Sequence, residues 1–269
     1  MDLETRRNEQ LDYYIMNRSE FGGEYGHHKL VAELQTYIPT LHKKTLGLDV
    51  GANVGNELGV LDTLCKEQGR KLIAFEPNPL NIPLLKESVT KFQDVEIQPI
   101  AVSDKEGVLP FFTFQNHENE PGYTWGGLRA GGKQIGNVVV RPLDDILKDY
   151  PSEEWDVKYV KIDTEGNDTL VIRGLQKNLY RTHYILFEAS DCLKDRRGPG
   201  EKNPLETCVK LLDEEGFDVY RLGTKRLLKL NGELWHPAYD NLLMWSNCFA
   251  LKKQDRILSN FLNEDGYYL

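Results

Sequence analysis

The sequence lacks the signs of a disulfide-rich or zinc-binding protein. Its 269 residues include only four cysteines, which lie far apart and form no C-x-x-C pair or Cys/His cluster: Cys65, Cys192, Cys208 and Cys248. Disulfide scaffolds and structural zinc sites require such clusters. We therefore expect reduced thiols, no structural metal, and cofactor chemistry that depends on other residues.

Basic charge and long apolar runs are also scarce. Lys and Arg total 33 against 42 Asp and Glu, for a formal net charge of −9. Proteins held on nucleic acid or on an anionic membrane usually have a basic excess, so neither partner is expected. No uncharged stretch approaches the roughly 20 residues of a membrane helix, and no apolar signal segment follows the charged start. These absences predict a cytoplasmic protein.

The composition that remains is that of an ordinary globular protein. Hydrophobic residues make up 40% and charged residues 28% of the chain, and neither disorder nor a coiled coil is indicated. The length suits one large domain with small additions.

The order of apolar segments predicts an α/β fold. Short apolar runs without alternation predict buried parallel strands, and amphipathic stretches between them predict helices. The expected strands span residues 45–50, 71–75, 95–102, 157–162 and 184–187, and the expected helices span 56–69, 80–92 and 169–179. We predict a doubly wound, mostly parallel sheet with helices on both faces.

Three segments depart from this repeat. Residues 1–42 have a helical pattern broken at Phe21-Gly22-Gly23, and we interpret them as an N-terminal helical cap. The main domain is expected over residues 43–255, with a lid insertion at about 108–140 that contains two extra strands. Near its end, strands 217–222 and 247–251 have no crossover helix between them and should be antiparallel. Residues 256–269 form a C-terminal tail.

Two motifs at predicted strand ends indicate an adenosine-containing cofactor. Gly51 and Gly55 follow the first strand and let the backbone approach a ligand closely. Glu76 ends the second strand, at the spacing where an acid accepts hydrogen bonds from ribose hydroxyls. In a doubly wound sheet both motifs lie at the edge where ligands bind.

The glycine loop argues against a dinucleotide. Its spacing is GxNxG instead of GxGxxG, because Asn53 stands where a pyrophosphate would require glycine. The Asn53 amide would crowd a pyrophosphate but can bind the amino-acid end of S-adenosylmethionine, and Asp49 would complement that cofactor's positive charge.

Six ordered motifs together resemble the FkbM family. They are Leu48–Gly55, Ala74–Pro79, Ala101–Gly107, Arg141–Leu147, Val160–Gly166 and Leu186–Glu188. Members of this family are S-adenosylmethionine-dependent O-methyltransferases of the class I fold, with a seven-stranded, mostly parallel sheet and an antiparallel C-terminal strand. The resemblance covers roughly residues 45–250 and implies a Rossmann-like methyltransferase domain.

The resemblance also implies site residues. The methionine part of the cofactor is expected at Asp49, Gly51, Asn53 and Gly55, the ribose at Glu76 and Asn78, and the adenine at Ala101, Val102 and Ser103. Asp163, after the fourth strand, is expected to face the methyl group. For Asn78 and Ser103, a role as turn or cap residues is an equal alternative.

A hydroxyl acceptor needs a base that removes its proton. We predict Asp163 for this role, followed by Glu188 on the neighbouring strand. Loops on the same edge predict acceptor contacts from His117, Trp125, Glu165 and His236. Glu165 could instead be a helix first-turn acid, and the two histidines could be solvated. Aromatic and cationic loops suit a sugar, a glycoconjugate or a related small molecule.

Three alternatives remain at this point. Magnesium held by Asp163 and Glu188 is disfavoured, because Ala189-Ser190-Asp191 supplies no acid–amide pair after Glu188. A nicotinamide-dependent reductase would need a hydride-transfer set that we do not find. A protein that binds S-adenosylmethionine without catalysis would also keep the glycine loop.

Overall fold

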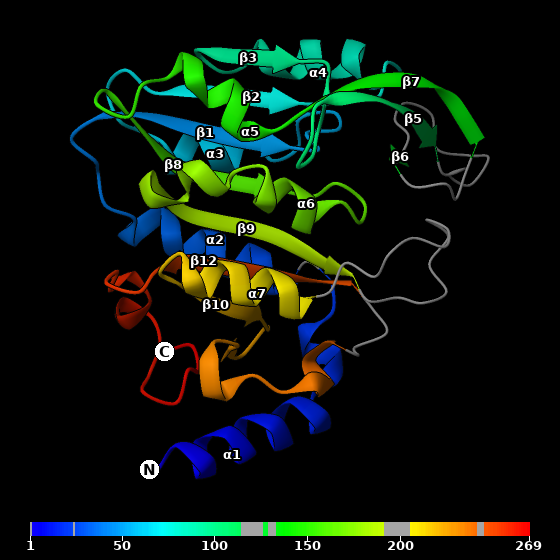
Figure 1. Cartoon of the computed structure of the whole chain (residues 1–269). Coiled ribbons are helices and arrows are strands. Elements are labelled where there is room, and N and C mark those ends of the chain that lie inside the picture. Colours follow the sequence, from blue (N-terminus) through cyan, green and yellow to red (C-terminus); the bar gives the residue numbers. More distant parts are fainter. Residues whose placement is uncertain (1, 24, 114–125, 129–132, 191–204, 241–244) are drawn as a thin grey trace. The chain divides into compact units, whose positions relative to one another are not determined.

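The computed structural model describes residues 2–23, 25–113, 126–128, 133–190, 205–240 and 245–269. The chain forms two compact units (Figure 1). The central unit consists of Thr40–Ile185 and Leu193–Lys202, and the terminal unit consists of Met1–Pro39, Leu186–Cys192 and Asn203–Leu269. Strands and helices occur in both units, so the predicted α/β class is confirmed.

The central unit is built on parallel strands. In spatial order these are β8 (Trp155–Ile162), β1 (Lys44–Val50), β2 (Lys71–Phe75) and β3 (Val95–Gln98). Six of the seven residues of β1 are buried, as expected for a parallel strand covered on both faces. The carboxyl ends of β1, β2 and β8 therefore lie at one edge, where the predicted site residues follow them.

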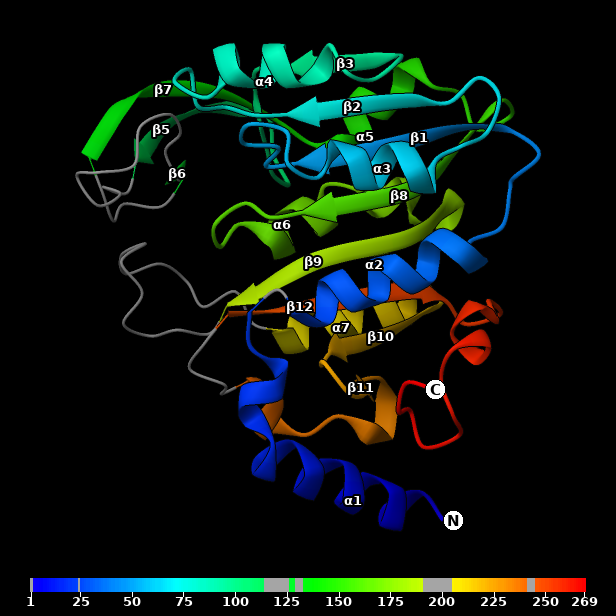
Figure 2. The ribbon, with the colours of Figure 1, turned by 180° about the vertical axis from the view of Figure 1, so that it is seen from behind.

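Helices cover both faces of these strands. They are α3 (Leu58–Leu64), α4 (Ile82–Val89), α5 (Leu143–Ile146) and α6 (Asp168–Arg173), with 3-10 turns η2 (Leu147–Asp149) and η3 (Gln176–Arg181). Figure 1 shows α5 and α6 on the near face, and Figure 2 shows α3 on the opposite face. On the α3 side, Leu58 and Leu85 pack with Ala74 in a buried apolar cluster. Burial of these apolar side chains holds the helices on the sheet.

The segment 95–102, predicted as one strand, is divided into two, because the chain turns at Pro99. Only β3 continues the parallel sheet, whereas β4 (Ala101–Val102) pairs with β7 (Lys133–Arg141) in a second sheet. A proline has no N–H for a sheet ladder, so a strand interrupted there can change sheets. The second sheet also contains β5 (Gly107–Thr113) and β6 (Gly126–Gly127). The strands β5 and β7 correspond to the two extra strands predicted for the insertion, and they pair antiparallel.

The terminal unit combines the two ends of the chain. Its helices and 3-10 turns are α1 (Leu3–Met16), η1 (Arg18–Phe21), α2 (Tyr25–Tyr37), α7 (Leu205–Glu214), η4 (Gly232–Leu234), η5 (Pro237–Asp240) and η6 (Ile257–Asn260). The predicted N-terminal helices are therefore present, with a break after Met16. Within the described ranges of the chain, every helix is too short or too polar to cross a lipid bilayer.

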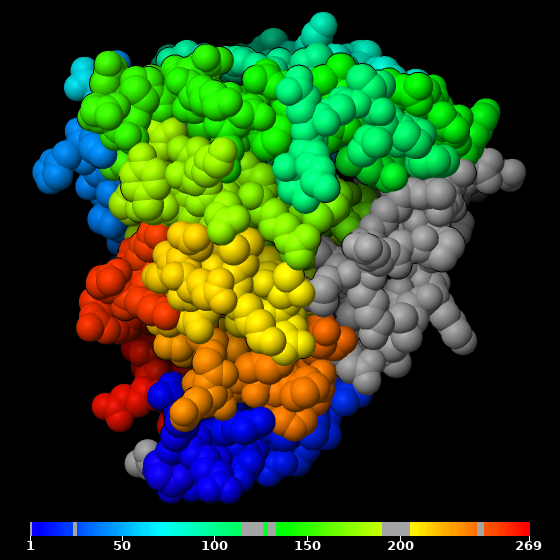
Figure 3. Space-filling model, in the orientation of Figure 1, coloured from blue at the N-terminus to red at the C-terminus, as the bar shows by residue number. Residues whose placement is uncertain are grey.

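Three strands of the terminal unit pair antiparallel with one another. The central one, β10 (Phe217–Leu222), pairs with β12 (Trp245–Lys252), as predicted, and with β11 (Leu227–Lys229), which was not predicted. The strand β9 (Thr182–Ser190) begins in the central unit and passes into the terminal unit at Leu186. In Figure 3, α7 is visible in yellow beside the orange segment that contains η5. Here the backbone N–H of Leu205 donates to Asp240 Oδ1 at 3.0 Å.

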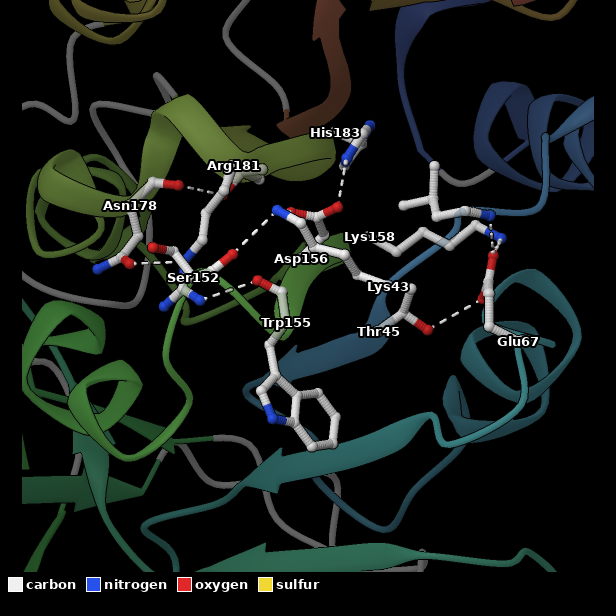
Figure 4. A network of polar contacts seen from close by, with 12 residues as sticks. Lys43, Thr45, Glu67, Ser152, Trp155, Asp156, Lys158, Asn178, Arg181 and His183 are labelled. Carbon is white, nitrogen blue, oxygen red and sulfur yellow. Dashed lines mark hydrogen bonds and ion pairs between the residues drawn. The ribbon is translucent and has the colours of Figure 1, made fainter.

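A buried ion pair fixes the amino ends of the central strands (Figure 4). Lys158 Nζ of β8 contacts Glu67 Oε1, and the Lys158 side chain is fully buried. Glu67 also accepts hydrogen bonds from the Leu41 N–H at 3.0 Å and from the Thr45 hydroxyl at 2.9 Å. Since a buried charge is stable only when it is paired and hydrogen-bonded, this contact ties β8 and β1 to the loop after α3.

Candidate functional site

The turn after β1 has a backbone shape that few residues tolerate. Gly51, Asn53 and Gly55 have φ angles of +82°, +51° and +89°. A Cβ added at Gly51 would lie 1.8 Å from the carbonyl oxygen of Asp163, so only glycine fits beneath the end of β8. The turn predicted from GxNxG is therefore present, and it lies directly against the residue predicted to act at the methyl group.

Glu76 joins this turn to the end of β2. Its Oε2 accepts the backbone N–H of Asn53 at 2.8 Å, and its Oε1 accepts that of Asn78 at 2.8 Å. The side chain is 5% exposed, and burial raises the pKa of Glu76 to about 7, although the Asn78 and Asn53 N–H groups favour the ionised form. These contacts hold the Glu76 carboxylate beside the glycine turn. This position agrees with the spacing of about 20 residues between the turn and Glu76.

The two asparagines of this region have different surroundings. Asn78 is fully buried, and its Oδ1 accepts the backbone N–H of Leu80 at 3.0 Å, which is the local turn role considered for it. Asn53 Oδ1 is buried and accepts no hydrogen bond from the part of the chain that the structure describes. A buried amide oxygen without a donor is costly, so Asn53 is suited to accept a hydrogen bond from a ligand.

Three charged side chains meet between the ends of β1 and β8. Asp49 of β1 is fully buried, and its Oδ1 lies 3.4 Å from Lys161 Nζ of β8. The same ammonium lies 3.5 Å from Asp163 Oδ2 and donates to the Gly51 carbonyl at 3.2 Å. Asp163 remains 41% exposed at the strand end. Lys161 thus links the glycine turn to Asp163, the predicted base.

Sequence reasoning missed Lys161, because its place in the site depends on the register of two strands. In a parallel pair, residues in register place their side chains on the same face, and Lys161 is in register with Asp49. Asp163 lies two residues further on, and its side chain is therefore expected on the same face. Only the pairing of β1 with β8 brings Lys161 to Asp49, since the two residues lie far apart in the sequence.

The residues expected around the adenine lie at β4. Ala101, Val102 and Ser103 are 5%, 2% and 5% exposed. The Val102 carbonyl accepts a hydrogen bond from Asn167 Nδ2 at 2.8 Å, which anchors β4 to the start of α6. The Ser103 hydroxyl lies 3.5 Å from Asp104 Oδ1, a distance at the limit for a hydrogen bond. These contacts fix the backbone at which the adenine is expected.

The inserted strands reach the turn after β8. Glu165 has a left-handed backbone with φ +56°, which is uncommon for a residue other than glycine and tends to occur at functional sites. A Cβ added at Gly127 of β6 would lie 3.5 Å from Glu165 Cβ, so β6 lies close to this turn. The insertion therefore flanks the residues that follow Asp163.

The other predicted residues belong to the terminal unit or lie outside the described residues. Glu188, in β9, and His236, before η5, belong to the terminal unit, and Glu188 is 9% exposed. His236 Nδ1 accepts the backbone N–H of Ala238 at 3.1 Å, a contact that stabilises its own loop. His117 and Trp125 lie outside the described residues. Their roles, like the catalytic role of Asp163, stay predictions.

The donor set of this edge fits an organic ligand. Glu76, the Asn53 amide and the backbone of the turn supply hydrogen-bond acceptors and donors for hydroxyl and amino groups. In the described ranges, no group of three or more His, Cys, Asp and Glu side chains is arranged to hold a metal ion.

Comparison with known proteins agrees with this geometry. The Methyltransferase FkbM domain matches residues 49–219 of the chain. The curated 2-O-methyltransferase NoeI of Sinorhizobium fredii is 26% identical over 184 residues, which cover 61% of this chain and 69% of that protein.

Solved methyltransferase structures show a weak similarity. Methyltransferase FkbM from Methylobacillus flagellatus has a TM-score of 0.47 at 13% identity, with 90% of this chain but only 59% of that protein covered. The O-methyltransferase from Bacillus cereus in complex with SAH has a TM-score of 0.42 at 9% identity, with 94% and 93% covered. This chain thus spans less than two thirds of the M. flagellatus protein.

Proposed function

Because the chain belongs to the FkbM methyltransferase family, we propose that it is an S-adenosylmethionine-dependent O-methyltransferase. Its acceptor would be a hydroxyl of a sugar, a glycoconjugate or a related small molecule. The observation that carries the proposal is the contact between Glu76 and the glycine turn. This contact supports a ribose site at the Glu76 carboxylate, next to a turn in which Asn53 would crowd a pyrophosphate.

The residues of the central unit fit the proposed cofactor. The turn from Gly51 to Gly55 would hold the methionine part, where the free Asn53 Oδ1 can accept from the ammonium group. Glu76 would accept from the ribose, and the backbone at Val102 would flank the adenine. When bound, S-adenosylmethionine supplies an electrophilic methyl group on a sulfonium sulfur.

In the proposed reaction, Asp163 is the base. The acceptor oxygen would take the methyl group as the bond from that group to sulfur breaks, and the hydroxyl proton would pass to a carboxylate oxygen of Asp163. The products are a methyl ether, S-adenosylhomocysteine and a proton that returns to solvent. Asp163 suits this role because it is 41% exposed at the strand end while Lys161 holds one of its oxygens. Orienting the two reactants supplies much of the acceleration.

The acceptor class rests on two kinds of support. The relative NoeI is named a 2-O-methyltransferase, which supports a hydroxyl oxygen as the methylated atom. The residues proposed to contact the acceptor are His117, Trp125, Glu165 and His236, and aromatic and charged side chains of this kind are typical of sugar sites.

Calorimetry with S-adenosylhomocysteine and with NAD tests the cofactor. We expect S-adenosylhomocysteine to bind and NAD to bind at least about 100-fold more weakly, since the turn lacks the glycine needed by a pyrophosphate. The opposite ranking would favour a reductase. Incubation with methyl-labelled S-adenosylmethionine and a panel of sugars and glycoconjugates, followed by mass spectrometry, then tests the reaction. Cofactor binding without transfer to any compound would favour a non-catalytic binding protein.

The affinity for S-adenosylhomocysteine should weaken as the pH falls below 7. The pKa of Glu76 in the free protein is raised to about 7, and ribose hydroxyls donate best to the ionised carboxylate. Binding must then displace a proton, which costs about tenfold in affinity for each pH unit below that pKa. Calorimetric titrations between about pH 5 and pH 8 measure the effect.

A matched pair of variants assigns this pH dependence. Glu76→Gln should bind more weakly and without the pH dependence, because an amide does not titrate. Glu96→Gln, on β3, removes a carboxylate that is paired with Lys71 and should bind as the wild type does. An affinity that stays constant across the range in the wild type would show that Glu76 is not the ribose acceptor.

A further inference from the structure

We propose that Lys161 is a positioning residue for the cofactor, which pairs with the buried carboxyl group of Asp49 and holds the carbonyl of Gly51 so that the glycine turn keeps its shape. This inference rests on the proposed function, because it takes the cofactor to be S-adenosylmethionine. Lys161 lies within the motif Val160–Gly166, but no role was predicted for it.

The geometry gives Lys161 three simultaneous contacts. Its Nζ lies 3.4 Å from Asp49 Oδ1, 3.5 Å from Asp163 Oδ2 and 3.2 Å from the Gly51 carbonyl oxygen. These groups belong to the end of β1, the end of β8 and the first residue of the turn. Since the Lys161 side chain is only 9% exposed, water does not replace the contacts easily.

The charges around Asp49 require this cation. Asp49 is fully buried, and Glu57 of the segment before α3 and Asp163 of the β8 end add negative charge to its surroundings. Glu76, after β2, also faces Lys161. Burial raises the pKa of Asp49 and Lys161 opposes that rise. Burial also disfavours the charged form of Lys161, but Asp49 and Asp163 outweigh it and raise the pKa of Lys161.

Loss of the Lys161 ammonium should change both the charge of Asp49 and the shape of the glycine turn. Without the ammonium, Asp49 would be a buried anion without a counter-ion, and such a carboxyl group takes up a proton. The Gly51 carbonyl would also lose its donor, at the point where the turn lies against Asp163. A turn that has lost this donor and the neighbouring charge should receive the cationic amino-acid end of the cofactor less well.

The test is calorimetry of S-adenosylhomocysteine binding in Lys161→Met. We expect Lys161→Met to bind S-adenosylhomocysteine with an affinity about 10- to 100-fold lower than that of the wild type. This factor corresponds to the interaction energy commonly found between residues in contact. Titrations above the pKa of Glu76, in buffers of different ionisation enthalpy, count the protons released. Lys161→Met should release more protons on binding than the wild type, because without the cation that opposes the rise in its pKa more of Asp49 is protonated before binding.

Two further variants separate positioning from stability. Lys158→Met also removes a buried lysine of β8, but one whose partner is Glu67, so it should lower stability and leave affinity and proton release unchanged. Asp49→Asn combined with Lys161→Met removes both charges and should abolish the extra proton release. If Lys161→Met alone does not fold, this double variant can be used to measure binding without the Lys161 ammonium.

The outcomes distinguish this inference from the proposed function. A wild-type protein that binds no S-adenosylhomocysteine overturns the proposed function and this inference with it. A wild type that binds it, with Lys161→Met unchanged in affinity and proton release, overturns the role of Lys161 alone. Extra proton release that persists in the double variant also overturns it, because Asp49 would not be its source.

Discussion

An Asp163→Asn variant is expected to transfer methyl groups about 10²- to 10⁴-fold more slowly than the wild type, the usual contribution of a positioned base. The amide has nearly the same shape as the carboxylate but cannot take the acceptor's hydroxyl proton. Initial rates with labelled S-adenosylmethionine, at saturating concentrations of the acceptor that the mass-spectrometric screen identifies, measure the loss.

Two controls accompany Asp163→Asn: its affinity for S-adenosylhomocysteine, and a variant of the nearby residue Glu165. Asp163→Asn should bind S-adenosylhomocysteine within a fewfold of the wild type, because Asn53 and Glu76 remain in place. Glu165→Gln, on the turn two residues further, should mainly raise the Michaelis constant of the acceptor. If Asp163→Asn keeps normal turnover, Asp163 is not the base, and Glu188 becomes the residue to test.

The second large effect is on stability. Lys158→Met should lower the free energy of unfolding by about 3–5 kcal/mol, because it leaves the carboxylate of Glu67 buried without its partner. Lys44→Met is the matched control on the surface. It breaks an ion pair with Glu154 in which both side chains are about half exposed, and it should cost only about 0–1 kcal/mol. Denaturant unfolding followed by circular dichroism measures both changes.

The same ion pair predicts an acid-sensitive fold. Burial alone would raise the pKa of Glu67, but the contacts with Lys158 and the Leu41 N–H outweigh it and hold that pKa below its ordinary value of 4.5. The folded state therefore binds this proton more weakly than the unfolded chain does. The resulting stability is fully present above pH 4.5 and is lost as the pH falls through the lower pKa of the folded state.

Glu67→Gln tests this acid sensitivity. The variant should be less stable near neutral pH, and its stability should fall less than that of the wild type on acidification below pH 4.5. Equal acid dependence in the two proteins would assign the effect to other carboxylates. Equal stability of Lys158→Met and Lys44→Met would show that the buried pair contributes no more than a surface pair.

Local sequence determined much of the proposed cofactor site. The turn after β1 was predicted because glycines and an asparagine at GxNxG spacing are the residues that tolerate a left-handed backbone. Glu76 was predicted because a strand, a helix and a second strand occupy a nearly fixed length of chain. The antiparallel pairing of β10 with β12 followed from the absence of a crossover helix.

The structure changed two features of the predicted central sheet. The strand expected over residues 95–102 is divided between two sheets. Its second part, β4, pairs with β7, which is distant in the sequence, so the local pattern does not predict this pairing. No local pattern in the sequence marks Lys158 and Glu67 as partners, yet they are buried together. Apolar periodicity reports which face of one element is buried but carries no information on which distant charges will meet.

The sequence by itself determined the α/β class, the family and the cofactor turn with Glu76, because each depends on residues close together in the chain. Only the tertiary structure decided that the N-terminal helices form one unit with the C-terminal strands, and that Lys161 stands between Asp49 and Asp163. The physical reason is that the register of β8 against β1 is fixed by burial and hydrogen bonding over whole strands. No spacing within either strand records that register.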